Sequence, residues 1–128
     1  MPAYTIEHVR QDGGEHLVVT LLESARGAFL GQIGELDALA AEARPRRVLV
    51  DESRLRVGLV GPADMRLIAE RWRTASALRT ARIAVFAPAP IVYGLNRMFQ
   101  ALAGGEAERR VALFRGRADA VAWLLGPG

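Results

Sequence analysis

Hydrophobic and polar positions along the chain follow two different periods. Short runs of β-branched, aromatic or otherwise apolar residues are typical of strands, and apolar residues three or four positions apart are typical of helices. Segments of the first kind are residues 4–10, 16–22, 47–51, 81–87 and 110–114. Segments of the second kind are residues 24–44, 62–75, 91–103 and 118–125. The predicted order of elements is therefore ββαβαβαβα.

Turn and cap residues fix where these elements begin and end. Asp12-Gly13-Gly14 supplies the positive φ values of a tight hairpin, so the first two strands are expected to be antiparallel. Pro45 stops the first helix, Pro62 begins the second, and Gly104-Gly105 ends the third. Strands that alternate with helices indicate an α/β fold with a mainly parallel, mixed sheet flanked by helices and right-handed crossovers. Residues 1–128 are expected to form one domain.

Composition narrows the class of protein. The 128 residues are 51% hydrophobic and 24% charged, which is globular usage. The chain has no cysteine and no lysine, so disulfides, thiol nucleophiles, P-loops and Schiff bases are excluded. No apolar run is long enough for a transmembrane segment and the first residues do not resemble a signal peptide, so we expect a cytoplasmic protein.

Positive charge is carried by arginine alone. The formal net charge is +3, and arginines are densest between Arg66 and Arg82. No aromatic residues interleave with them in a nucleic-acid-binding pattern, so we interpret them as a solvated helix face and do not expect nucleic-acid binding.

Catalytic and metal-binding motifs are scarce. The two histidines, His8 and His16, lie on the predicted hairpin with Glu7 and Glu15 beside them. A two-histidine carboxylate site is an alternative, but we expect no metal and no cofactor, because solvated histidines are the commoner outcome on a hairpin. No serine lies in a nucleophile elbow, so we expect a non-catalytic protein.

Candidate ligand-binding residues lie beyond the carboxyl ends of the predicted parallel strands, where open α/β sheets bind their ligands. They are Asp51, Ser53, Tyr93, Arg97 and Arg115. An enzyme that uses Asp51, Tyr93 and Arg97 is a third and weaker alternative to the two binding functions considered below.

The start of the third helix supports a small anionic ligand. Ala89, at the expected N-cap, has no side-chain oxygen for the first N–H groups of the helix. An anion near Arg97 is one partner for these groups. A cap from Asp51 or Glu52 is the structural alternative.

The third helix also has more apolar residues than one buried stripe requires. Val92, Tyr93 and Phe99 are the candidates for an exposed interaction face. If they are exposed, they favour self-association as a homodimer, or docking of a protein partner. If they are not, they belong to the core.

The element order, together with Val48-Leu49-Val50-Asp51 and the stretch from Tyr93 to Gln100, resembles the STAS superfamily and, more narrowly, the SpoIIAA-like bacterial proteins. The resemblance implies a regulatory or interaction module that binds a protein partner, and relatives of SEC14 type imply lipid-headgroup binding as the alternative. Antagonists in this superfamily are switched by phosphorylation at Asp-Ser-Ser-Gly. This chain has Leu59-Val60-Gly61-Pro62 there, so that switch is not expected.

Overall fold

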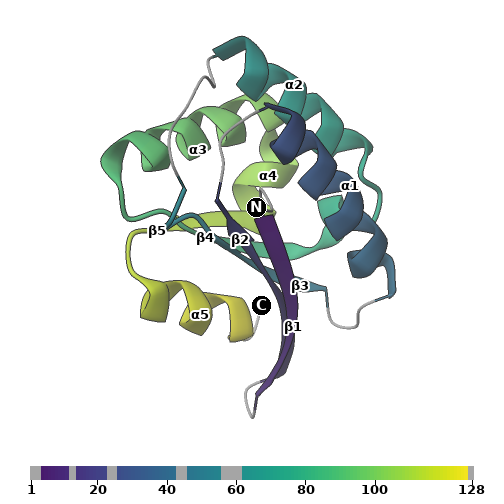
Figure 1. Cartoon of the computed structure of the whole chain (residues 1–128), viewed down its shortest axis with the longest axis vertical. Helices are drawn as coiled ribbons and strands as arrows, with labels where there is room; N and C mark the ends of the chain where they lie inside the picture. The colour runs from purple at the N-terminus through teal and green to yellow at the C-terminus, as the bar shows by residue number, and fades with distance from the viewer. Residues whose placement is uncertain (1–3, 12–13, 23–25, 43–45, 56–61, 127–128) are drawn as a thin grey trace.

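The structure is a computed structural model, and it describes residues 4–11, 14–22, 26–42, 46–55 and 62–126. Five strands and five α-helices lie within these ranges, with one short 3₁₀ helix (Figure 1). The strands are β1 (Tyr4–Gln11), β2 (Gly14–Leu21), β3 (Arg47–Asp51), β4 (Arg82–Phe86) and β5 (Val111–Phe114). The helices are α1 (Arg26–Glu42), α2 (Pro62–Thr74), η1 (Leu78–Thr80), α3 (Pro90–Ala103), α4 (Gly105–Arg110) and α5 (Arg117–Leu125). None of the helices in these ranges combines the length and apolar character needed to span a membrane.

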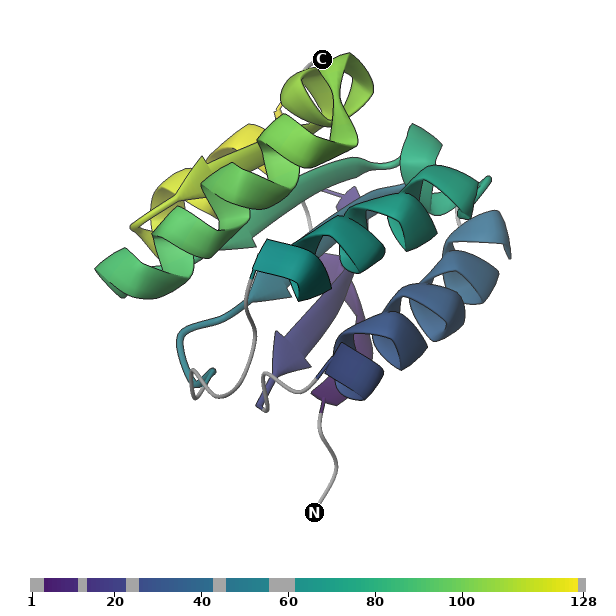
Figure 2. The ribbon, with the colours of Figure 1, turned by 90° about the horizontal axis from the view of Figure 1, so that it is seen from above.

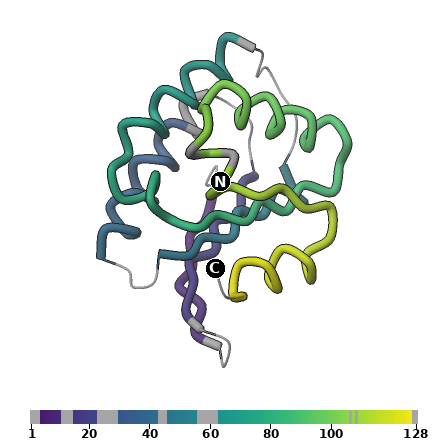
Figure 3. Tube along the Cα trace, turned by 180° about the vertical axis from the view of Figure 1, so that it is seen from behind, coloured from purple at the N-terminus to yellow at the C-terminus, as the bar shows by residue number. Residues whose placement is uncertain are grey.

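The five strands form one mixed sheet in the order β1-β2-β3-β4-β5. The pair β1–β2 is antiparallel and every other neighbouring pair is parallel, as the hairpin and the alternating pattern predicted. From β2 onward each crossover advances in the same direction, so crossovers of one hand place their helices on one face of the sheet. Figure 2 shows α1, α2 and α3 side by side on that face, and Figure 3 shows α5 on the opposite side.

Each face of the sheet has its own core. The larger core lies between the sheet and the layer of α1, α2, α3 and α4, and its side chains on β3 and β4 include Val48, Ile83 and Val85. The smaller core lies under α5, where Leu49 and Ala84 meet Leu124. Val48 and Leu49 are neighbours in the chain and both have 0% exposure, so β3 is buried on both faces of the sheet.

The boundaries of the predicted elements agree closely with the structure, but two short elements were not predicted. These are η1 and α4, the second of which has six residues, Gly105–Arg110. A six-residue helix rich in Glu and Arg is too short to show an apolar stripe. Gly104 separates α3 from α4 with a φ of 94°, which side-chain-bearing residues rarely adopt.

The positions Leu59 to Gly61, compared above with the phosphorylated motif, lie outside the described residues.

Several arginines, inside and outside the dense stretch from Arg66 to Arg82, bind backbone carbonyls at helix ends. The last carbonyls of a helix have no partner within it, and a guanidinium group supplies several donors at once. Examples of these donors and their carbonyl acceptors are Arg46 to Ala40 in α1, Arg73 to Leu102 in α3, and Arg82 to Trp123 in α5. Arg82 also lies over the ring of Trp123, with its guanidinium carbon 3.9 Å from the ring centre. These arginines therefore have a structural role.

The helix α1 contains glycines, which weaken a helix unless they allow close packing against a neighbour, and the structure shows no such packing at Gly31. A Cβ atom built there meets nothing within 4 Å. At Gly34 the nearest atom is in the flexible side chain of Arg71, 3.2 Å away. Gly31 therefore weakens the helix without any compensating contact.

We predict that Gly31→Ala stabilises the protein by about 1 kcal/mol, because alanine has the higher helix propensity and its methyl group enters open space. Gly104→Ala is the contrasting variant, and it should lose about 1–3 kcal/mol because of its positive φ. Urea denaturation measures both free energies of unfolding. A loss of stability in Gly31→Ala would show that α1 packs more tightly there than the structure indicates.

Candidate functional site

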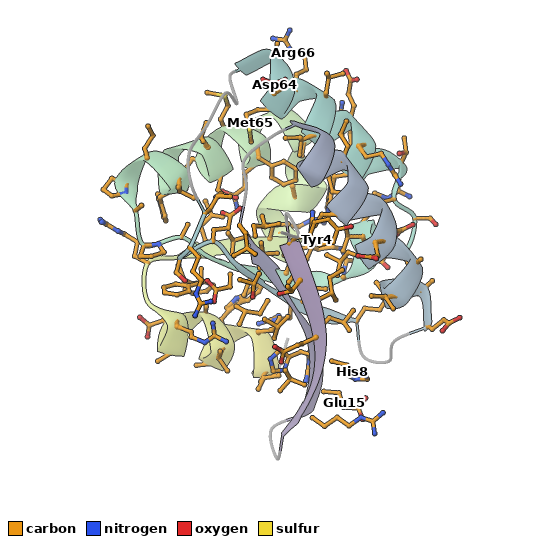
Figure 4. All side chains as sticks on the ribbon, viewed as in Figure 1. Tyr4, His8, Glu15, Asp64, Met65 and Arg66 are labelled. Carbon is orange, nitrogen blue, oxygen red and sulfur yellow. The ribbon has the colours of Figure 1, made fainter. Side chains whose placement is uncertain are left out.

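A cavity of about 100 Å³ lies between the sheet and the helices α1, α2 and α3. Its lining is mostly aliphatic and aromatic, and the described lining residues include Met65, Ile68 and Phe99. Met65 is labelled in Figure 4, where the neighbouring Arg66 points away from the molecule. Three polar side chains, in addition to the indole of Trp72, interrupt this apolar lining: Gln32, Glu52 and Asn96. Ligand sites typically combine an apolar lining with a few polar groups in this way.

Glu52 enters the cavity because of the alternation of β3. Val48 and Val50 belong to the larger core, and Glu52 is two residues further along the same face. Its backbone continues the ladder beyond β3, since its N–H donates to the carbonyl of Phe86 at 2.9 Å. The side chain therefore occupies a core position, where the residue is only 5% exposed.

Asn96 is the partner of Glu52. Its side-chain amide donates to Oε1 of Glu52 and also, at 2.9 Å, to the carbonyl of Val92 one turn earlier in α3. The second bond fixes the orientation of the amide on α3. The pair connects the end of β3 to α3 across one wall of the cavity.

Burial determines the protonation of Glu52. Loss of solvent raises its pKa from 4.5 to about 7, which the Asn96 hydrogen bond opposes and the nearby charge of Asp51 reinforces. The group therefore changes charge near neutral pH, unlike an ordinary glutamate. A carboxyl that titrates there inside an apolar cavity is a candidate functional group.

Trp72 is a further residue of the cavity wall, and it carries a buried polar atom. The residue is 3% exposed, and its indole N–H has no hydrogen-bond acceptor among the described residues. Its ring packs edge-on against Phe99 at a centroid distance of 5.9 Å. Buried indole N–H groups usually find an acceptor, so this one is an exception among buried polar groups.

The strand ends predicted as a ligand-binding rim do come together, but their polar groups bind one another. Oδ1 of Asp51 accepts hydrogen bonds from the backbone N–H and the hydroxyl of Ser53, at 2.9 and 2.6 Å. Oδ2 of Asp51 forms an ion pair with Arg117 at 2.7 Å. Arg115 donates to the carbonyl of Pro88 at 3.4 Å. Asp51 therefore holds the end of β3 against the start of α5.

The other predicted residues of α3 are divided between core and surface. Val92 is 2% exposed and lines the cavity, so it is not part of an exposed face. Tyr93 and Phe99 are half-buried and pack against the larger core, and Arg97 is exposed. Ala89 is the N-cap, as predicted, and no described side chain caps the helix there. Neither Asp51 nor Glu52 takes that role.

The histidines of the hairpin do not form one site. His8 lies opposite Leu17, and His16 lies opposite Val9. Because Val9 directly follows His8 on β1, and paired residues share a face, the two imidazoles point to different faces of the sheet. His8 lies 3.3 Å from the carboxylate of Glu15 near the end of the hairpin (Figure 4). His16 is buried, and burial, followed by the charge of Arg117, lowers its pKa. Within the described ranges no three His, Asp or Glu side chains form a metal-binding group.

Sequence reasoning missed Gln32, Trp72 and Asn96 as site residues and considered Glu52 only as a cap. A signal for Glu52 was present, because the alternation Val48, Val50 and Glu52 places a carboxylate at a core position. Asn96 follows Val92 by four residues in α3 and so shares its face. The missing hydrogen-bond acceptor of Trp72 has no counterpart in the sequence, because it depends on which atoms pack around the ring.

We predict that Glu52 makes stability depend on pH. Its folded pKa of about 7 exceeds the ordinary 4.5, so the folded protein retains a proton that the unfolded chain releases between these values. The contribution of Glu52 to the free energy of unfolding should fall by about 3 kcal/mol as the pH rises from 4.5 to above 7. Urea denaturation across this range should show the loss in the wild type and not in Glu52→Gln.

Glu70→Gln, at an exposed position of α2, is the matched control and should keep the wild-type profile. If the difference in stability between wild type and Glu52→Gln is the same at every pH, Glu52 does not titrate as its surroundings imply.

Comparison with known proteins adds no assignment to this geometry. No family model and no curated protein matches the chain. The case for a function therefore rests on the cavity and on the carboxyl–amide pair of Glu52 and Asn96 in its wall.

Proposed function

We propose that this protein is a non-catalytic binding module that holds a small, mostly apolar molecule between its sheet and the layer of α1, α2 and α3. The observation that carries the proposal is the buried carboxyl of Glu52, paired with Asn96, in the wall of a mostly apolar cavity. An ionisable group at such a position costs stability, and a core built only for stability would place an apolar side chain there. A ligand that forms hydrogen bonds with these polar groups would explain why they are placed there.

The charge of the cavity favours apolar ligands over anions. None of the described residues that line it is basic, and Arg97 is exposed on α3. The ionised form of Glu52 would repel an anion across a medium of low dielectric constant. The small anionic ligand considered from the sequence therefore fits this cavity less well than a neutral one.

A STAS-like fold is part of the proposal. It is supported by the β1-β2-β3-β4-β5 order, by the opening antiparallel hairpin and by the helices that follow the parallel strands. On this basis we propose a regulatory module whose state depends on the occupant of the cavity.

We predict that toluene binds the cavity with a dissociation constant of about 1 mM or tighter, as expected for a seven-atom apolar ligand. The titration uses Trp123→Phe, which leaves Trp72 as the single tryptophan, and follows its fluorescence. Val50 lines the cavity, so Val50→Phe should fill it and abolish binding while the protein stays folded.

Val9→Phe is the matched control. It is the same substitution at another strand position, but Val9 packs against the smaller core and not against the cavity. It should retain toluene binding. Circular dichroism and melting temperature establish that both variants fold. Equal toluene binding by wild type and Val50→Phe, with both folded, would place the ligand outside this cavity.

Docking of a protein partner, or self-association, is a second candidate function. Ile91 at the start of α3 is 63% exposed and Leu67 on α2 is 41% exposed. Exposed apolar side chains of this size favour association when they lie in one patch.

For this candidate we predict a concentration-dependent dimer in size-exclusion chromatography with light scattering, and its loss in Ile91→Asp. Leu39→Asp, on α1, is the control because Leu39 is 43% exposed on a different helix. A monomer at every concentration leaves docking of a different protein as the only form of this function.

A further inference from the structure

The carboxylate of Glu52 has no positively charged partner in the cavity that it lines. Among the described lining residues Glu52 is the only ionisable acid, and none of them is basic. We propose that the occupant of the cavity is a small primary amine with an apolar body, whose ammonium group pairs with the carboxylate of Glu52. This inference rests on the proposed function and names the ligand class for the same cavity.

Glu52 has an oxygen available to such a group. Asn96 donates to Oε1, and no described residue donates to Oε2. The fully enclosed side-chain polar atoms that lack a partner in the described residues are Nδ1 of His16 and Nε1 of Trp72, so Oε2 of Glu52 is not sealed in protein. Because Glu52 lines the cavity and is only 5% exposed, the open space beside Oε2 is the cavity.

Two amide oxygens supply acceptors for the other hydrogens of an ammonium group. The amide nitrogen of Asn96 donates to Glu52 and to the carbonyl of Val92, and its Oδ1 has no donor among the described residues. Gln32 lines the same cavity from α1, and no described residue donates to its side-chain oxygen. A primary ammonium group carries three N–H donors and no acceptor, so it matches a wall rich in oxygen acceptors.

The charge of the wall favours a cation over a neutral or anionic group. A charge buried away from water is stable when it is paired and hydrogen-bonded, and an ammonium group beside a carboxylate meets this condition. Asp51, the neighbouring carboxylate, already forms an ion pair with Arg117. Glu52 has no such cation among the described residues, and without one it binds a proton more readily, since burial raises its pKa to about 7.

The rest of the lining determines the body of the amine. It is aliphatic and aromatic, and it includes Met65, Ile68 and Phe99. An apolar cavity of about 150 Å³ in another protein accommodates benzene, and this cavity measures about 100 Å³. A single ring or a short branched chain is therefore the largest body expected inside without movement of the walls. Benzylamine is a probe that combines one ring with one ammonium group.

The test compares benzylamine with benzyl alcohol and toluene, two uncharged probes of nearly the same shape. Binding of each probe to the full chain is measured by isothermal titration calorimetry at pH 8. Benzylamine should bind about ten-fold more tightly than benzyl alcohol, the effect of one hydrogen bond between charged groups.

The affinity for benzylamine should also depend on pH. It should rise about ten-fold from pH 6 to pH 8, because the bound amine requires ionised Glu52 and the free protein releases that proton at a pKa of about 7. An alkylammonium group, like that of lysine, keeps its own proton over this range. At pH 7 binding should release about half a proton, measured as a difference in heat between phosphate and HEPES buffers. The affinity for toluene should show no such rise.

Glu52→Gln keeps the shape of the side chain and removes its charge. Its affinity for benzylamine at pH 8 should fall about ten-fold and lose the rise with pH, while its affinity for toluene stays close to the wild-type value. A purely structural effect of the substitution would weaken both probes equally. Glu70→Gln removes a carboxylate from an exposed position of α2, and this matched control should keep the wild-type affinities.

Three results would overturn the inference while the proposed function stands: benzylamine no tighter than benzyl alcohol, an affinity for benzylamine that stays constant from pH 6 to pH 8, or equal weakening of benzylamine and toluene in Glu52→Gln. The first two need only the wild-type chain, so they decide the matter even if the variant does not fold. If no probe binds, the cavity is not a ligand site, and the proposed function and this inference fail together.

Discussion

The direction in which the sheet is wound determines the rest of this structure. Because β2, β3, β4 and β5 follow one another without a reversal of order, their crossover helices lie on a single face. The opposite face is left to α5. The two cores are consequently unequal, and the cavity lies in the larger one. The described sheet has no point at which the strand order reverses, and such a point is what creates the ligand crevice of doubly wound folds.

The polar groups of the molecule differ in whether they have partners. At the strand ends, Asp51, Ser53 and Arg117 satisfy one another, which joins α5 to the sheet. Near the opposite ends of the strands, arginines satisfy helix carbonyls. In the cavity wall, by contrast, Trp72 has a donor without an acceptor in the described residues, and Glu52 has a buried carboxyl whose charge changes near neutral pH. Unsatisfied buried groups are rare in native proteins, and they need an explanation that satisfied ones do not.

Much of the fold could be predicted from the sequence, because local signals and tertiary packing agree. The run from Arg47 to Asp51 is short, apolar and β-branched, and its strand has those bounds in the structure. Gly104 ends α3 as predicted. The candidate site could not be predicted to the same extent. The general rule for open sheets directed attention to residues beyond the strand ends, whereas the cavity depends on how α1, α2 and α3 pack over one face, which no single segment encodes.

Glu52 shows why the candidate site was harder to predict from the sequence than the fold. Beside Asp51 in the sequence it looks like one of two loop carboxylates, but the alternation of β3 separates their environments completely. Asp51 meets Arg117 and Ser53 at a partly exposed strand end, whereas Glu52 meets Asn96 inside the core. One step along an extended backbone reverses the face of the sheet, and with it the solvent exposure and the partners of the side chain. The arrangement places a titratable group next to an apolar cavity at the cost of burying it, and a ligand with a hydrogen-bonding group would offset part of that cost.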